Sequence, residues 1–250
     1  MTANPPLKLA TIEAPQLSGN VRLFGGVMQT EVTSQEDERQ SVFHGKSARP
    51  MYLAFVDILG FGDRVKRGFD EVLKVYDDVL HSAEILKGMR EEVIVRVYSD
   101  AFLLSCERLG PLVGVIQGLH MQTLSHDCLI RGGIGYGEHI EAADDNNLYV
   151  VSQALVKAVD VEKSIKYPCV AFHPEIVIPQ EWWKTNVHPI YRGVLCFEGI
   201  KLVNPFNRYW FQSSMTRVAM AKRETPEHKE KHDWFLRLYE AVASGQLLVP

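Results

Sequence analysis

Two aspartates, each beside an apolar run of strand length, are the residues in this chain best suited to chemistry. Asp57 follows the run 51–56 (MYLAFV), and Asp100 lies in the short link between the runs 93–98 and 101–104. A carboxylate next to a buried strand is costly unless it is paired or holds a cation. Two that converge offer the hard oxygen ligands that Mg²⁺ and Mn²⁺ prefer. Paired divalent ions serve phosphoryl transfer, so the sequence predicts a metal site of that kind.

The apolar pattern predicts the elements that must position these two side chains. In chain order, the expected elements are a strand at 51–57, a helix at about 63–87, strands at 93–98 and 101–106, a helix at about 111–126 and a strand at 129–136. This βαββαβ order is that of the ferredoxin-like α+β unit, an antiparallel sheet with both helices on one face. Its first and third strands are antiparallel neighbours, so Asp57 and Asp100 should meet.

The segments around this core are expected to decorate it. Further elements are predicted at 21–32 (a short hairpin), 152–165 (a helix), 168–172 and 207–212 (strands) and 226–243 (a charged terminal helix). We therefore expect an N-terminal arm at 1–49, one catalytic domain at 50–215, and a C-terminal helix at 216–250 that packs on or extends the same domain.

The composition excludes several classes of function. The chain has 250 residues, 46% of them hydrophobic, and a formal net charge of −4. This suffices for a sizeable core, and no global positive charge favours nucleic acid or a membrane surface. Four separated cysteines without a CxxC motif favour reduced thiols. With neither a signal peptide nor an apolar run of bilayer length, a cytoplasmic protein is expected.

Three motifs in this frame resemble those of the class III nucleotidyl cyclases. The segments 56–61 (VDILGF), 96–100 (RVYSD) and 131–137 (RGGIGYG) are similar to the family's two metal motifs and to its Arg-x-Gly-Ile-x-x-Gly strand. The resemblance covers roughly residues 50–165. It implies the conversion of a nucleoside triphosphate to a 3′,5′-cyclic monophosphate and pyrophosphate. It also implies two Mg²⁺ or Mn²⁺ ions and a homodimer with active sites at the subunit interface.

The resemblance assigns roles to individual residues. Asp57 and Asp100 would bind the two ions, and the main-chain carbonyl of Ile58 would be a further metal ligand. Main-chain amides at the start of the first helix would meet the phosphates. The amides expected to do so are those of Leu59, Gly60 and Phe61.

Departures from the family pattern affect the residues expected to stabilise the transition state and to select the nucleobase. Arg96 replaces the Lys that commonly selects a purine, and Ser99 replaces the Gly before the second Asp. Val156 and Asp160 stand where the family has its transition-state Asn and Arg. Lys157 would then replace the missing cation near the α-phosphate.

The segment 154–158 (ALVKA) is most similar to the pyrimidine cyclases of the bacterial anti-phage system called Pycsar. Those enzymes make cyclic UMP or cyclic CMP, which signals to a separate effector protein. Arg96 is the candidate for reading the base, and because its guanidinium donates to carbonyl acceptors, UTP is favoured over CTP. Tyr98 shares a strand face with Arg96. Tyr149 lies near the family's usual base-selecting position.

Other interpretations remain open. Asp57 alone is also a typical helix N-cap, and Asp100 alone a typical turn residue. A purine cyclase, a dinucleotide cyclase and a catalytically inactive nucleotide-binding module are the alternative functions. Arg96, in place of the usual Lys, disfavours a purine cyclase, and the hairpin sequence YSDAF at 98–102 disfavours a dinucleotide cyclase. The altered motif at 152–158 leaves an inactive nucleotide-binding module possible.

Overall fold

The computed structural model describes residues 41–89, 92–143, 147–206 and 229–250. The chain divides into two units, 1–40 and 41–250, and all described residues belong to the second. The hairpin predicted at 21–32 and the strand predicted at 207–212 therefore lie outside the described residues.

The core has the predicted βαββαβ order, with one helix divided in two. Its elements are β1 (Arg49–Ile58), α1 (Phe61–Arg67), α2 (Phe69–Met89), β2 (Ile94–Tyr98), β3 (Ala101–Cys106), α3 (Leu109–Ser125) and β4 (Ile130–Ala143). These strands lie in the order β2-β3-β1-β4, and each neighbouring pair is antiparallel. The ferredoxin-like α+β core predicted from the sequence is thus confirmed.

The prediction of a single helix at 63–87 was wrong, because the chain bends at Gly68 between α1 and α2. Gly68 has an extended backbone (φ −167°, ψ 99°). Its N–H donates to the Arg64 carbonyl at 3.0 Å, and its carbonyl accepts from the Val72 N–H at 3.2 Å. Since the apolar residues keep a helical spacing across the bend, periodicity alone did not reveal it.

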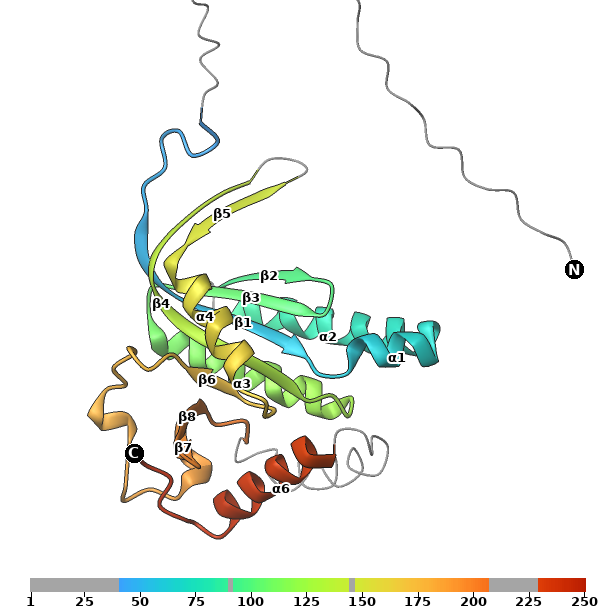
Figure 1. The fold of residues 1–250 in the computed structure, drawn as a ribbon, viewed down its shortest axis with the longest axis vertical. Helices are drawn as coiled ribbons and strands as arrows, with labels where there is room; N and C mark the ends of the chain where they lie inside the picture. The colour runs from blue at the N-terminus through green and yellow to red at the C-terminus, as the bar shows by residue number, and fades with distance from the viewer. Residues whose placement is uncertain (1–40, 90–91, 144–146, 207–228) are drawn as a thin grey trace, which may run out of the picture. The chain divides into compact units, whose positions relative to one another are not determined.

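Helices cover both faces of the sheet (Figure 1). On one face, α2 and α3 bury an apolar core that includes Val56 and Ile58 of β1 together with Val79, Leu112 and Ile116. On the other face lies α4 (Gln153–Ser164), close to its predicted bounds. Because side chains alternate along a strand, Asp57 points to the α4 face while Ile58 points to the α2–α3 face.

The helix α4 rests directly on the backbone of β4. A Cβ atom added at Gly133 would lie 2.1 Å from the Ala158 carbonyl oxygen, and one at Gly135 would lie 2.1 Å from that of Ala154. Glycines on the strand and alanines on the helix therefore make the close approach possible. The glycine-rich segment 131–137 thus determines where α4 packs on the sheet.

The strand β4 is longer than predicted. It continues past Gly137, where a turn was expected, to Ala143, and its far end pairs with β5 (Leu148–Ser152). In Figure 1 the paired ends of β4 and β5 extend away from the rest of the sheet as an arm. A Cβ at Gly137 would lie 2.9 Å from the Gln153 Cβ, so this glycine permits the approach of α4.

The C-terminal part of the chain extends the sheet and builds a second core. Its elements are β6 (Val170–Phe172), the short 3₁₀ helices η1 (Gln180–Trp182) and η2 (Pro189–Tyr191), β7 (Val194–Phe197), β8 (Ile200–Val203) and α6 (Lys229–Ala243). β6 runs parallel to β4, and β8 and β7 follow. Neither β7 nor β8 was predicted from the sequence. Trp234 and Phe235 of α6 are buried here with Leu195 and Phe206.

No helix within the described residues is both long and apolar enough to cross a membrane.

Candidate active site

The structure brings Asp57 and Asp100 together. Asp57 pairs with Ala101 in the register of β1 with β3, and the Ile58 N–H donates to the Asp100 carbonyl oxygen at 3.0 Å. The two carboxyl groups lie close enough for the charge of Asp100 to raise the pKa of Asp57.

The electrostatic surroundings of Asp57 favour a bound proton or cation. Burial, followed by the charge of Asp100, raises the pKa of Asp57 to about 6, with a smaller contribution from Glu162 in the same direction. The charge of Arg131 acts in the opposite direction. A divalent cation would remove the repulsion between the carboxylates, and their oxygens are the hard ligands that Mg²⁺ and Mn²⁺ prefer. The side chains present therefore fit such ions.

Arg131 and Glu162 complete the charged surroundings of Asp57. The Arg131 Nη2 bonds the Glu162 Oε1 and lies 3.8 Å from the Asp57 Oδ2. Among the described residues, the buried Arg131 Nε has no hydrogen-bond partner. Neither residue was predicted from the sequence to lie in the site. No sequence pattern predicts that Glu162 lies near Asp57, because only the packing of α4 on β4 brings it to the site.

The turn that carries Asp100 has an unusual backbone and a specific support. Ser99 has φ 52°, a left-handed conformation that glycine adopts without the steric cost paid by other residues. The Tyr76 hydroxyl on α2 donates to the Ser99 carbonyl oxygen. Phe61 packs against the Tyr76 ring, with centroids 5.5 Å apart. Tyr76 was not among the predicted site residues, because an apolar helix stripe does not show which member reaches another element.

The segment after β1 offers fewer phosphate donors than expected. Gly60 is the N-cap of α1, with φ 73°, so the alternative in which Asp57 caps this helix is wrong. The Leu59 N–H already donates to the Leu129 carbonyl oxygen at 2.9 Å. The amides of Gly60 and Phe61 remain as candidates, and α1, with seven residues, adds little dipole.

Arg96 and Tyr98 lie on the same face of the sheet as Asp57, on its edge strand β2. Register pairs Tyr98 with Ala101, which in turn pairs with Asp57. The Tyr98 side chain is 45% exposed. Arg96 forms a two-point ion pair with Glu141 of β4, at 2.7 Å from Nη2 to Oε1 and 3.4 Å from Nε to Oε2. The guanidinium is thus held in one orientation.

Lys157 and Tyr149 do not approach the two aspartates of their own chain. The Lys157 Nζ lies 2.6 Å from the Glu175 Oε2. Its Cβ is next to Gly135, four residues and about 13 Å along β4 from the neighbour of Asp57. Tyr149 pairs with Ala142 on the β4–β5 arm, further still.

Within the described part of the chain, no group of three or more His, Cys, Asp or Glu side chains is arranged to hold a metal ion. A metal centre here would therefore rely on two carboxylates and on main-chain oxygens such as that of Ile58.

Comparisons with known proteins gave matches only among solved structures. No protein-family model and no curated protein matches the chain. An adenylate cyclase from Trypanosoma brucei in its monomeric state is 13% identical with a TM-score of 0.49, over 64% of this chain and 89% of that one. A bacterial light-regulated adenylyl cyclase is 15% identical with a TM-score of 0.46. The match covers 71% of this chain and 56%, little over half, of that one. The adenylyl cyclase CyaB from P. aeruginosa is 13% identical with a TM-score of 0.43, over 65% of this chain and 97% of that one.

Proposed function

We propose that this chain is a nucleotide cyclase that converts a pyrimidine nucleoside triphosphate to its 3′,5′-cyclic monophosphate and pyrophosphate. The observation that carries the proposal is the close approach of Asp57 and Asp100, where the Ile58 N–H donates to the Asp100 carbonyl oxygen at 3.0 Å and the charge of Asp100 raises the pKa of Asp57. Both belong to sequence motifs that resemble the metal motifs of class III cyclases, and adjacent central strands deliver them to one point.

Two divalent ions, Mg²⁺ or Mn²⁺, are the proposed cofactors. Asp57 and Asp100 would hold them, with the Ile58 carbonyl as a further ligand. The ions, when bound, would lower the pKa of the ribose 3′-hydroxyl and neutralise charge on the triphosphate. The raised pKa of Asp57 supports this assignment, because the folded chain leaves an anionic pair poorly compensated.

The chain's own groups would position the triphosphate next to this pair. The amides of Gly60 and Phe61 follow β1 directly, and Gly60 has no side chain to block close approach. Arg131, fixed by Glu162, adds a positive charge beside Asp57. Such preorganised donors and charges are the main means by which proteins promote phosphoryl transfer.

A second copy of the chain would complete each active site. Arg96, Tyr98, Tyr149 and Lys157 are the remaining proposed substrate-contacting residues. Because Lys157 and Tyr149 lie away from the aspartates of their own chain, they would act at the site of the partner subunit. The Glu175 side chain that pairs with Lys157 is 67% exposed, so releasing this lysine costs little.

The proposed base is uracil, ahead of cytosine. Glu141 occupies two donor nitrogens of Arg96, Nη2 and Nε, and orients the guanidinium. The N–H groups of Nη1 are left to donate to carbonyl acceptors such as uracil O2 or O4. The proposed biological role, a second messenger in anti-phage signalling that acts on a separate effector protein, follows from the resemblance at residues 154–158.

The test is product formation by the purified full chain. Each of ATP, GTP, CTP and UTP is incubated with Mn²⁺, and products are identified by mass spectrometry. Cyclic UMP, lost in Asp57→Ala and Asp100→Ala but retained in Asp63→Ala, supports the proposal. Asp63 is a suitable control because it is an exposed acid in the first turn of α1.

Other outcomes of the same assay would support one of the alternative functions. Cyclic AMP or cyclic GMP would show a purine cyclase instead. If calorimetry shows that a nucleotide binds but none is turned over, the chain is an inactive nucleotide-binding module.

A further inference from the structure

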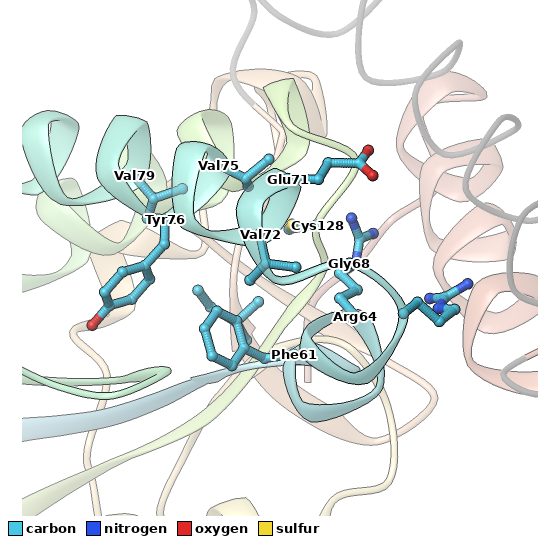
Figure 2. Close-up of a pocket in the computed structure, with 11 residues that line it drawn as sticks. Phe61, Arg64, Gly68, Glu71, Val72, Val75, Tyr76, Val79 and Cys128 are labelled. Carbon is cyan, nitrogen blue, oxygen red and sulfur yellow. The ribbon is translucent and has the colours of Figure 1, made fainter.

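A cavity of about 240 Å³ lies beneath the corner between α1 and α2 (Figure 2). Its lining is mainly apolar and consists, in its apolar part, of Ile58, Phe61, Val72, Val75, Val79 and Cys128. Ile58 belongs to the core on the α2–α3 face, whereas the Asp57 side chain points to the opposite face of the sheet. The cavity therefore lies on the opposite face of the sheet from the Asp57 side chain and adjoins the proposed nucleotide site at Phe61, whose side chain lines it.

Charged groups at one end of the cavity favour an anion. Figure 2 shows Arg64 and Glu71 on one side and Tyr76 on the other. Arg67 also lines the cavity, so two cations face one carboxylate. The Arg64 Nη2 donates to the Asp127 carbonyl oxygen at 2.6 Å, which holds its guanidinium in place. A carboxylate with an apolar body matches this distribution of charge and apolar surface.

The size of the cavity limits its ligand. Benzene fits an apolar cavity of about 150 Å³, so about 240 Å³ suits one or two fused rings. A nucleoside triphosphate is larger and carries more negative charge than Arg64 and Arg67, opposed by Glu71, would compensate. The ligand class is thus a small aromatic or aliphatic acid.

The cavity is linked to both aspartates of the proposed metal site. Ile58, which lines the cavity, directly follows Asp57. Tyr76, which also lines it, donates its hydroxyl proton to the carbonyl of Ser99, the residue before Asp100. A ligand that packs against Tyr76 would restrict the motion of this tyrosine and of the turn it supports.

We propose that this cavity is an effector site for a small apolar carboxylic acid, and that its occupancy raises the metal affinity of Asp57 and Asp100 through Tyr76. The coupling, but not the binding of the acid, rests on the proposed function. The physical basis is preorganisation, since a turn already ordered by one ligand costs less to order for the next.

Binding is tested by calorimetry on the full chain with 2-naphthoate as the probe, without nucleotide or metal. Typical ligand efficiencies give an expected Kd on the order of 0.1–1 mM. Val75→Phe, which fills the cavity, should abolish binding, and Arg67→Met should weaken it at least fivefold. Lys66→Met is the matched control, because its side chain is 79% exposed and does not line the cavity.

Coupling is tested by measuring Mn²⁺ affinity with and without saturating 2-naphthoate, using the spin-resonance signal of free Mn²⁺. We expect at least a threefold gain, and the same factor in naphthoate affinity when Mn²⁺ is present, since linkage is reciprocal. Tyr76→Phe keeps the ring but loses the hydroxyl. It should bind naphthoate normally and show no gain.

Each result decides a separate point. If the folded wild-type chain does not bind naphthoate, or if Val75→Phe binds it equally well, the effector site is refuted. Equal Mn²⁺ affinity with and without naphthoate refutes the coupling alone. If Mn²⁺ does not bind under any condition, the metal site and the coupling are both wrong, while the calorimetry still decides the cavity.

Discussion

The side chains of Asp57 and Asp100 lie close enough for their charges to repel each other, although 42 residues of chain separate the two positions. Antiparallel pairing of β1 with β3 makes this contact, and burial makes it costly when both groups are ionised. Two neighbouring carboxylates that serve to bind metal ions are therefore expected to lower the stability of the metal-free folded protein, and unfolding experiments can measure this cost.

Asp57→Asn should stabilise the metal-free protein at pH 7. The folded pKa of about 6 lies above the usual 3.8, so between these values the folded state binds more protons than the unfolded state. The stabilising contribution of Asp57 is therefore present below about pH 4 and lost as pH rises to about 6. The expected gain is about 1–2 kcal/mol at pH 7 and near zero at pH 4. Urea unfolding with EDTA at both pH values measures it, and a gain that does not depend on pH would contradict the mechanism.

Protons should compete with Mn²⁺ at this site. A cation binds the ionised carboxylate, and Asp57 becomes protonated below about pH 6. For one competing proton, Mn²⁺ affinity should fall about tenfold from pH 7 to pH 5. Calorimetry at the two pH values provides the measurement. Equal affinities would mean that Asp57 is not a ligand.

Ser99→Gly should stabilise the protein modestly. Ser99 is held at φ 52°, where a side chain costs roughly 1–2 kcal/mol and glycine costs none. The greater freedom of glycine in the unfolded chain offsets part of this, which leaves a gain of about 0.5 kcal/mol. Thermal unfolding measures the change. Tyr76→Phe, which removes the hydrogen bond to the Ser99 carbonyl, should act in the opposite direction.

Gly135→Ala should strongly destabilise the protein. The new Cβ would lie 2.1 Å from the Ala154 carbonyl oxygen, so α4 would have to move off β4. The expected loss is about 3 kcal/mol or more, in line with overpacked cores. Gly62→Ala is the matched control, because its Cβ would meet nothing within 4 Å and alanine favours the helix α1. Equal unfolding free energies for the two variants would exclude this packing.

Mixing two inactive variants should restore activity if the site is shared between subunits. Asp57→Ala and Lys157→Ala each remove one half of every site. A heterodimer of the two has one intact site, so an equal mixture should recover about a quarter of wild-type activity. Cyclic nucleotide formation after mixing and exchange provides the measurement. No recovery, with exchange verified by mass spectrometry, would place Lys157 outside the site.

Local patterns in the chain predicted the central elements well. The run at 51–57 and the paired runs around Asp100 are strands as expected, and α3 and α4 lie close to their predicted bounds. These predictions succeeded because alternation and helical spacing report directly on which side chains are buried. The bend at Gly68 and the extension of β4 beyond Gly137 were missed. Each depends on contacts between segments, which local spacing does not report.

By itself, the sequence determined the βαββαβ order and the presence of two acidic residues at strand ends. Only the tertiary structure decided which groups meet. It placed Arg131 and Glu162 beside Asp57, tied Tyr76 to the Ser99 turn, and kept Lys157 away from the aspartates of its own chain. The reason is physical: burial and periodicity are written along the chain, whereas a charge network forms only where strand register and helix packing bring distant residues together.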